Sequence, residues 1–279
     1  MDMYATTVYV ITDEVLRALK IKDDPQVHMT NAEVITFAIV SAKFFYSNFK
    51  RARFICKELK LFKKMLSNSR LNRRIRAISW EIWKAIFRFL ALIFSKVSPN
   101  NEFVVDSFPV SCCEKSRIDK RKIFLRREYI GYAASKKRYF CGIKVHMVVT
   151  GDGCPVEVEF RSGSESDLSV LWELELNIPP DSILYADGAY NCFDLEDILS
   201  EQKIQFMPKR GSKAKNRKRT ADEEKEISSK RQIVETAFSC ITDLFPRNLR
   251  VCTEQGFYVK IHCSILAYSM SLLCNNILS

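Results

Sequence analysis

SILYADGAYN, residues 182–191, is the stretch around which the rest of the chain can be ordered. Its apolar run, residues 183–186, has the length and the bounds of a buried strand. The strand pattern ends on Asp187, which Gly188 follows directly, and a helical pattern begins a few residues later. An aspartate followed by glycine commonly makes a turn, and on this stretch alone that interpretation is favoured. Ligands of open α/β sheets also collect where strands end, so Asp187 is a site candidate as well.

Two more carboxylates lie in apolar surroundings elsewhere in the chain. The run FVVDSFPV, residues 103–110, predicts a strand with Asp106 in its middle. A charge at such a position is costly unless it is paired or binds a cation. Glu235 lies within a long helical pattern, about residues 222–245, at the edge of an apolar stripe. Asp106, Asp187 and Glu235 are therefore the candidate site acids.

The order of predicted elements after residue 100 indicates how these acids meet. Three strands form a meander, and a helix, a strand, a helix, a strand and further helices follow. This order resembles that of a ribonuclease-H-like domain, an α/β fold with a mixed five-stranded sheet and helices. In that fold Asp106, Asp187 and Glu235 would converge at one edge of the sheet. Clustered carboxylates repel one another unless cations neutralise them, and ligand sets made only of oxygen favour Mg²⁺ or Mn²⁺. We expect two such ions, which together can promote phosphodiester displacement.

Residues 1–98 have a different pattern and predict an all-helical domain. The stretch contains no glycine, and Thr30 with Glu33 has the spacing of a capping box. Residues 34–45 are apolar nearly all round, which indicates a buried helix. From Lys50 to Arg76 there are eleven basic residues and one acid, interleaved with apolar residues. We interpret this segment as two basic amphipathic helices of a DNA-binding domain, residues 1–98, that precedes a catalytic domain, residues 99–279.

The charge balance of the whole chain favours a polyanionic partner. There are 44 Lys and Arg against 33 Asp and Glu, a formal net charge of +11. Such an excess suits nucleic acid or an anionic membrane surface. Two apolar stretches, about residues 78–95 and 258–278, contain charged side chains and are interpreted as core helices, so no membrane is expected. The loop 209–219 has seven basic residues and no acid, and we expect it to be a mobile arm that contacts phosphates.

The cysteines and histidines exclude two other kinds of site. The ten cysteines contain no CxxC pair, and the three histidines lie far from any paired cysteines, so a zinc site is disfavoured. The N-terminus begins with acids instead of the basic segment of a secretory signal. We expect free thiols in a reducing cytoplasm.

At the level of whole motifs, the chain resembles the DDE transposases of bacterial insertion sequences, most closely insertion-sequence family 982. The stretches that carry the resemblance are SRLNRR (69–74), VVDSFPV (104–110), GYAASKKRYFCGIKVHMVVTGDGCPVE (131–157), ILYADGAYN (183–191) and KRQIVETAFSCITDLFPR (230–247). The resemblance implies that Asp106, Asp187 and Glu235 are the catalytic, metal-binding triad. It also implies that Arg231, four residues before Glu235, belongs to the arginine–glutamate signature of related transposases.

The implied activity is metal-dependent cleavage and strand transfer at the ends of the element. The partners would be double-stranded DNA, in the form of terminal inverted repeats and target, and further copies of the chain on that DNA. The location would be the bacterial cytoplasm, with nucleoid association when DNA is bound. The basic residues expected to contact DNA are Lys136, Lys137, Arg138, Lys144, Arg231, Arg73 and Arg74.

The chain departs from the family pattern at four positions. Ser228 stands where the signature has tyrosine, Thr242 where it has lysine, Gly188 where relatives have a basic residue, and Ser166 where they often have histidine. Two alternatives therefore stay open beside an active transposase. One is a nuclease of the same fold without strand transfer, and the other is a catalytically decayed copy that only binds DNA.

Overall fold

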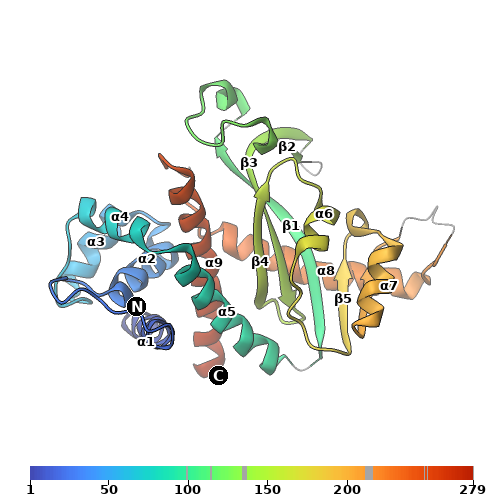
Figure 1. Cartoon of the computed structure of the whole chain (residues 1–279), viewed down its shortest axis with the longest axis horizontal. Coiled ribbons are helices and arrows are strands. Elements are labelled where there is room, and N and C mark those ends of the chain that lie inside the picture. The colour runs from blue at the N-terminus through green and yellow to red at the C-terminus, as the bar shows by residue number, and fades with distance from the viewer. Residues whose placement is uncertain are drawn as a thin grey trace. The chain divides into compact units, whose positions relative to one another are not determined.

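The chain forms two compact units in the computed structural model (Figure 1). The structure describes residues 1–98, 100–113, 115–133, 137–210, 216–247, 249 and 251–278. The first unit combines Met1–Leu90 with Cys240–Ser279, and the second is Ala91–Ser239. This division differs from the predicted boundary between residues 98 and 99, because the C-terminal segment belongs with the N-terminal helices.

The first unit is helical throughout the part that the structure describes. Its helices are α1 (Asp2–Ala18), α2 (Asn31–Phe45), α3 (Phe49–Glu58), α4 (Asn68–Ala77), most of α5 (Trp80–Val97) and α9 (Glu254–Leu278). α3 and α4 confirm the two predicted basic helices. The segment between them is longer than predicted, because α3 ends at Glu58 and Ser67 caps α4 by accepting a hydrogen bond from Arg70 N–H.

α2 is the central helix of this unit. The predicted capping box is present: Glu33 N–H donates to Thr30 Oγ1 at 3.1 Å, and Thr30 N–H donates to the Glu33 carboxylate at 2.7 Å. The helix is buried from Val34 to Ala42, which confirms the prediction of a helix apolar on all sides. α1, α3, α4 and α9 all pack against it.

α9 packs with the N-terminal helices of the first unit. It is apolar, as predicted, but it packs with α1, α2 and α4 instead of completing the second unit. Within the described residues it is the one helix long and apolar enough to cross a membrane, and 61% of its most apolar window is buried. A core helix of a soluble protein passes the same test of length and composition. The burial agrees with the interpretation of this stretch as a core helix.

The second unit is built on one mixed sheet. Its strands in the described residues are β1 (Glu102–Cys113), β2 (Ile130–Ala133), β3 (Arg138–Thr150), β4 (Pro155–Ser162), β5 (Ser182–Ala186) and β6 (Ile204–Pro208). β1 lies in the middle, antiparallel to β3 and parallel to β5, and β5 is parallel to β6. β2 and β4 pair with β3 along its other edge. The prediction of five strands was wrong by one, because β2 is a four-residue strand inside a basic segment.

Helices cover both faces of the sheet (Figure 1). α6 (Asp167–Glu173) and α7 (Phe193–Glu201) lie on one face, and α8 (Ala221–Thr242) passes across the other. Successive residues of a strand point to opposite faces. The side chain of Phe108 accordingly packs on Phe238 of α8, with ring centroids 4.5 Å apart, whereas Ser107 reaches Asp167 of α6. Asp106 shares the face of Phe108 and so points toward α8.

Candidate active site

Asp106 lies on the central strand and is held in a partly dehydrated position. Neighbouring strands pair with β1 on both sides here, and its Oδ1 accepts a hydrogen bond from Ser107 N–H at 2.7 Å. Burial and, to a smaller extent, the nearby Asp187 charge together raise the pKa of the Asp106 carboxyl to about 6. The Ser107 N–H and the Arg231 guanidinium oppose this shift. The site therefore favours a cation beside Asp106.

Asp187 follows β5 and lies beside Asp106 because the two strands are parallel. The register pairs Val105 with Ala186, so the next residue on each strand is one of the two aspartates. Asp187 also begins the 3-10 turn η4 (Gly188–Tyr190), where its Oδ1 accepts from Gly188 N–H at 2.6 Å. Asp187 can therefore begin a turn with Gly188 and also belong to a site with Asp106.

Glu235 and Arg231 lie one turn apart on α8 and complete the cluster. Arg231 Nη2 is 3.3 Å from Asp106 Oδ2 and 3.7 Å from Glu235 Oε1, and Arg231 Nη1 is 3.4 Å from Asp187 Oδ1. Lys230, the neighbour of Arg231, pairs with Glu102 of β1 at 2.6 Å and helps to fix α8 on the sheet. One guanidinium therefore contacts carboxylates from three separate elements.

The cluster has two more negative than positive charges when its three carboxylates are ionised. Three carboxylates surround a single guanidinium, and the side chains of Asp187 and Glu235 are 41% and 59% exposed, so their oxygens keep acceptor capacity toward solvent. Among the described residues, no group of three or more His, Cys, Asp or Glu side chains converges closely enough to hold a metal ion. The three carboxylates converge on Arg231 instead.

A comparison with protein families identifies the domain that contains these residues. The model of the transposase DDE domain matches residues 98–270, which include the sheet, α8 and all three carboxylates. The chain belongs to this family. A piggyBac transposase, in a cryo-EM structure of its synaptic complex with hairpin DNA, is similar over 97% of this chain and 74% of that chain, with 11% identity and a TM-score of 0.47. No curated protein matches the chain.

A further acid, Asp167, lies on the face of the sheet opposite to α8. Asp167 Oδ1 accepts from Ser107 Oγ at 2.8 Å and from Lys144 Nζ at 3.2 Å. Lys144 also donates to the Glu165 carbonyl at 2.8 Å, and Ser166, not Asp167, is the N-cap of α6. Asp167 therefore joins α6 to β1 and β3 and lies outside the cluster around Arg231. Lys144, predicted to contact DNA, has internal partners for its ammonium group.

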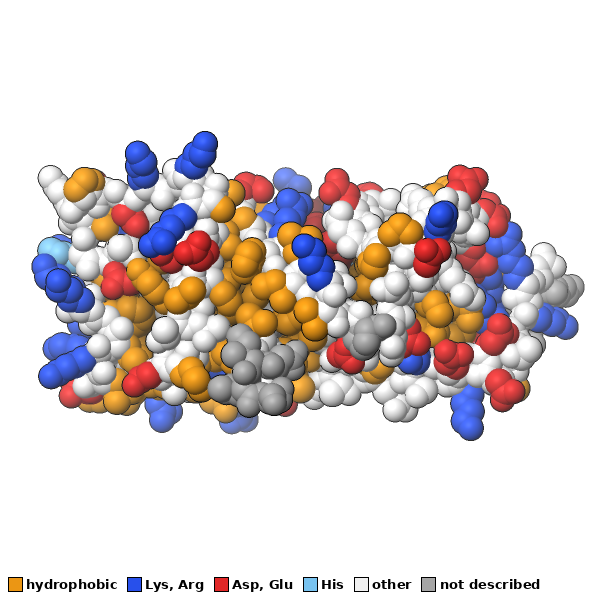
Figure 2. Space-filling view, turned by 90° about the horizontal axis from the view of Figure 1, so that it is seen from below, with side chains coloured by type: hydrophobic (Ala, Val, Ile, Leu, Met, Phe, Trp, Pro, Cys, Tyr) orange, Lys and Arg blue, Asp and Glu red, His pale blue; other side chains and the backbone are white. Residues whose placement is uncertain are grey.

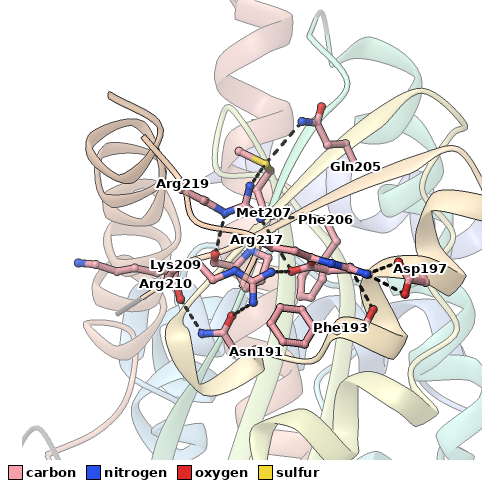
Figure 3. Close-up of polar contacts among 12 residues, drawn as sticks. Asn191, Phe193, Asp197, Gln205, Phe206, Met207, Lys209, Arg210, Arg217 and Arg219 are labelled. Atoms are coloured by element: carbon pink, nitrogen blue, oxygen red, sulfur yellow. Dashed lines mark hydrogen bonds and ion pairs between the residues drawn. The ribbon is translucent and has the colours of Figure 1, made fainter. Parts of the chain in front are cut away.

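The loop after Asp187 is tied to the rest of the DDE domain by Asn191 and Arg210 (Figure 3). Asn191 Nδ2 donates to the Lys209 carbonyl at 2.7 Å, and Arg210 Nη1 donates to Asn191 Oδ1 at 2.9 Å. Arg210 N–H donates to Glu224 Oε1 of α8 at 2.8 Å. These bonds connect the loop that carries Asp187, the end of β6 and the helix that carries Glu235.

Glu196 of α7 holds three arginines of the predicted basic arm. Arg210 forms an ion pair with it, Arg217 lies 3.0 Å from its Oε2, and Arg219 lies 3.9 Å from its Oε1. Figure 3 shows Arg210 and Arg217 beside the ring of Phe193, with guanidinium carbons 4.6 and 5.0 Å from the ring centroid. These three residues of the arm, which was predicted to be mobile, have internal partners in the structure. Residues 211–215 of the arm lie outside the described part of the chain.

Arg219 is held by acceptors at the end of β6. Its Nε donates to the Pro208 carbonyl and its Nη2 to the Phe206 carbonyl, both at 3.2 Å. Figure 3 shows the same side chain reaching Met207. Sequence reasoning missed Asn191, Glu196 and Arg210 as site-supporting residues. The one available signal was the acidic run Asp194–Asp197 beside a basic loop.

The remaining residues predicted to contact DNA lie in different surroundings. Arg73 on α4 is exposed, whereas Arg74 donates to Asn31 Oδ1 at 3.0 Å and supports the first unit. Lys137 and Arg138 are exposed at the start of β3, and Lys136 lies outside the described residues. Figure 2 shows one face of the molecule, on which Lys and Arg side chains stand singly or in small groups. The basic excess is therefore not collected in one patch on that face.

The backbone beside Asp187 does not require glycine. A Cβ added to Gly188 would lie 3.4 Å from the Lys209 carbonyl oxygen and 3.8 Å from Asn191 Nδ2, both ordinary contact distances. A Cβ would therefore be tolerated at this position.

Proposed function

We propose that this chain is a divalent-metal-dependent transposase of the bacterial insertion-sequence type, closest to insertion-sequence family 982. It would act on the terminal inverted repeats of its element, within the bacterial cytoplasm and at the nucleoid. The catalytic domain would be ribonuclease-H-like, and the basic helices α3 and α4, of which α4 carries Arg73, would bind DNA. The single observation that carries the proposal is the convergence of Asp106, Asp187 and Glu235 on one guanidinium in a transposase DDE domain.

The donor set suits Mg²⁺ or Mn²⁺, because it consists of carboxylate oxygens that already surround a positive group. Asp106, Asp187 and Glu235 would hold the metal, which when bound activates the attacking oxygen and stabilises the leaving oxygen of a phosphodiester. In this proposal Arg231 is the counter-ion of the metal-free site. It would leave the carboxylates as metal and DNA bind, and its guanidinium would then be available to a phosphate.

The basic residues supply the DNA contacts of the proposal. Exposed Arg73, Lys137 and Arg138 would bind the phosphate backbone in a salt-dependent manner without reading sequence. Two element ends have to be handled together, so the active form would be a homo-oligomer on DNA.

The test is a cleavage assay on DNA that carries the inverted repeats flanking the coding sequence. Asp106→Asn, Asp187→Asn and Glu235→Gln are each expected to lower Mg²⁺-dependent cleavage on the order of a thousandfold or more, because the three act as a unit. Binding of the same DNA should be retained. Joining of pre-cut ends to target DNA distinguishes a transposase from a nuclease. Metal-dependent cleavage that survives in a purified triad variant would contradict the assignment, and an inactive wild type that still binds DNA would favour a decayed copy.

A further inference from the structure

Two tyrosines lie side by side in solvent on the β2–β3 pair, away from the carboxylate cluster. Tyr132 and Tyr139 are opposite each other in the antiparallel register, with ring centroids 5.1 Å apart and ring planes at 60°. Their exposed fractions are 51% and 55%. A cross-strand aromatic pair stabilises a hairpin, but that role does not require half of each ring to face water. The contacts described above for the carboxylate cluster do not involve these two side chains.

The other face of the same strands is packed tightly and holds the pair in place. Phe140 is buried, and a Cβ on Gly131 would come within 1.9 Å of the Gly163 carbonyl oxygen. Gly163 N–H donates to the Gly142 carbonyl at 3.1 Å, and Ser164 N–H donates to the Glu128 carbonyl at 3.0 Å. The tyrosines are therefore presented by an anchored element, not by a loose loop tip.

The sequence segment that contains the pair, residues 117–139, is strongly basic. Among the described residues from Arg117 to Arg138, nine charged side chains are exposed, of which seven are basic and two are acidic. The basic ones are Arg117, Lys120, Lys122, Arg126, Arg127, Lys137 and Arg138, and the acidic ones are Asp119 and Glu128. One of the two acids, Glu128, already pairs with Arg126 at 3.7 Å. This balance complements a polyanion and disfavours a basic or apolar protein partner.

We propose that Tyr132 and Tyr139 form a stacking surface for unpaired bases of DNA whose phosphates are bound by the surrounding basic residues. Aromatic rings stack on any base, and one stacked base changes affinity on the order of tenfold. Bases inside a duplex already stack on one another and are not available to the rings. The surface therefore selects a frayed end or a short single-stranded overhang. This inference rests on the proposed function, because it takes DNA as the substrate, and it adds which part of the DNA is bound.

The experiment compares two DNA molecules with the full-length chain. One is a blunt duplex, and the other is the same duplex with a short unpaired overhang, each labelled for fluorescence anisotropy. Wild-type protein should bind the overhang DNA about tenfold more tightly than the blunt DNA. The double variant Tyr132→Ala, Tyr139→Ala should lose this preference while its affinity for blunt DNA stays near that of wild type. Tyr132→Phe with Tyr139→Phe should keep the preference, because the rings remain.

Trp172→Ala is the matched control. Trp172 is also exposed, at 44%, but it lies on α6, outside the basic segment 117–139. Its replacement should leave the overhang preference unchanged. As a readout that needs no variant, 2-aminopurine placed in the overhang should be quenched when wild-type protein binds, because a stacked base loses fluorescence.

The outcomes separate this inference from the proposed function. Equal affinity of wild type for both DNA molecules, or a preference that persists in the double alanine variant, overturns the stacking surface and leaves the transposase proposal standing. Binding to neither DNA overturns both. If the alanine variant fails to fold, an unquenched 2-aminopurine signal with wild type still overturns the stacking surface.

Discussion

Two charged clusters lie at the ends of neighbouring parallel strands and have opposite compositions. At β5, one guanidinium, Arg231, contacts the three carboxylates of Asp106, Asp187 and Glu235. Beyond β6, one carboxylate, Glu196, is surrounded by three guanidinium groups. The first cluster has two unmatched negative charges, and the second has two unmatched positive charges before other partners are considered.

The two clusters differ in how the unmatched charge is satisfied. In the Glu196 cluster, Arg219 donates to main-chain carbonyls, Arg217 also pairs with Asp197, and the ring of Phe193 faces two of the cations. In the Arg231 cluster the partly exposed carboxylates keep unused acceptor oxygens. A cluster whose charges are satisfied internally supports structure, whereas one with unused acceptors can bind a ligand. This difference is why we assign metal binding to the first cluster and positioning to the second.

The largest expected effect is on stability, at Glu196. Glu196→Gln removes the acid from a site where the Glu196 and Arg210 side chains are 11% and 5% exposed. Removing one partner of a buried ion pair leaves the other charge uncompensated and typically costs about 3–5 kcal/mol. We expect a loss of this size in the free energy of unfolding, measured by urea denaturation, and faster hydrogen exchange in peptides that cover β5 and β6.

Asp197→Asn is the matched control for Glu196→Gln. Asp197 contacts Arg217 at 2.8 Å, but its side chain is 62% exposed, so solvent screens the pair and replaces it. Its urea midpoint should stay close to that of wild type. Equal losses in the two variants would show that the buried cluster has no special role.

A smaller effect is expected at the centre of the first cluster. Arg231→Ala removes a positive charge that lies 3.3 to 3.7 Å from the carboxylates and competes with a metal ion for them. We expect Mn²⁺ affinity in the absence of DNA to rise by about tenfold. This change is small compared with the charge–charge repulsion that is possible between Arg231 and a metal ion at such distances. Isothermal titration measures it, with Lys230→Ala as the control, since Lys230 pairs with Glu102 instead. Unchanged or weaker Mn²⁺ binding in Arg231→Ala would contradict the competition.

Much of the local structure of both units could be predicted from hydrophobic periodicity and turn residues. The strands at Asp106 and before Asp187, the helix at Glu235 and the capping box at Thr30 are all present. Each depends on residues close together in the sequence, which is why local patterns identified them. Asp106 and Asp187 lie side by side because β1 and β5 are adjacent and parallel, and the approach of Glu235 was expected from the order of elements, which resembles that of a ribonuclease-H-like domain.

Longer-range pairing could not be predicted in the same way. A basic run has the same pattern whether it is solvated or paired, so the arm that contains Arg210 and Arg219 looked like a phosphate-binding loop. Its true partner, Glu196, is set by the packing of α7 on β6. The apolar surface of α9 likewise indicated burial without indicating which helices would cover it. β2 is only four residues long and contains Gly131, which hides its strand pattern.

The central claim is that Asp106, Asp187 and Glu235 form a divalent-cation site, and Mn²⁺ titration of the full-length chain tests it most directly. Wild type should bind Mn²⁺, and Asp106→Asn should lose that binding, because it removes a buried carboxylate from the cluster. Asp167→Asn should retain it, since Asp167 lies on the opposite face of the sheet with Ser107 and Lys144. Equal Mn²⁺ binding by wild type and Asp106→Asn, or none by wild type, would contradict the account.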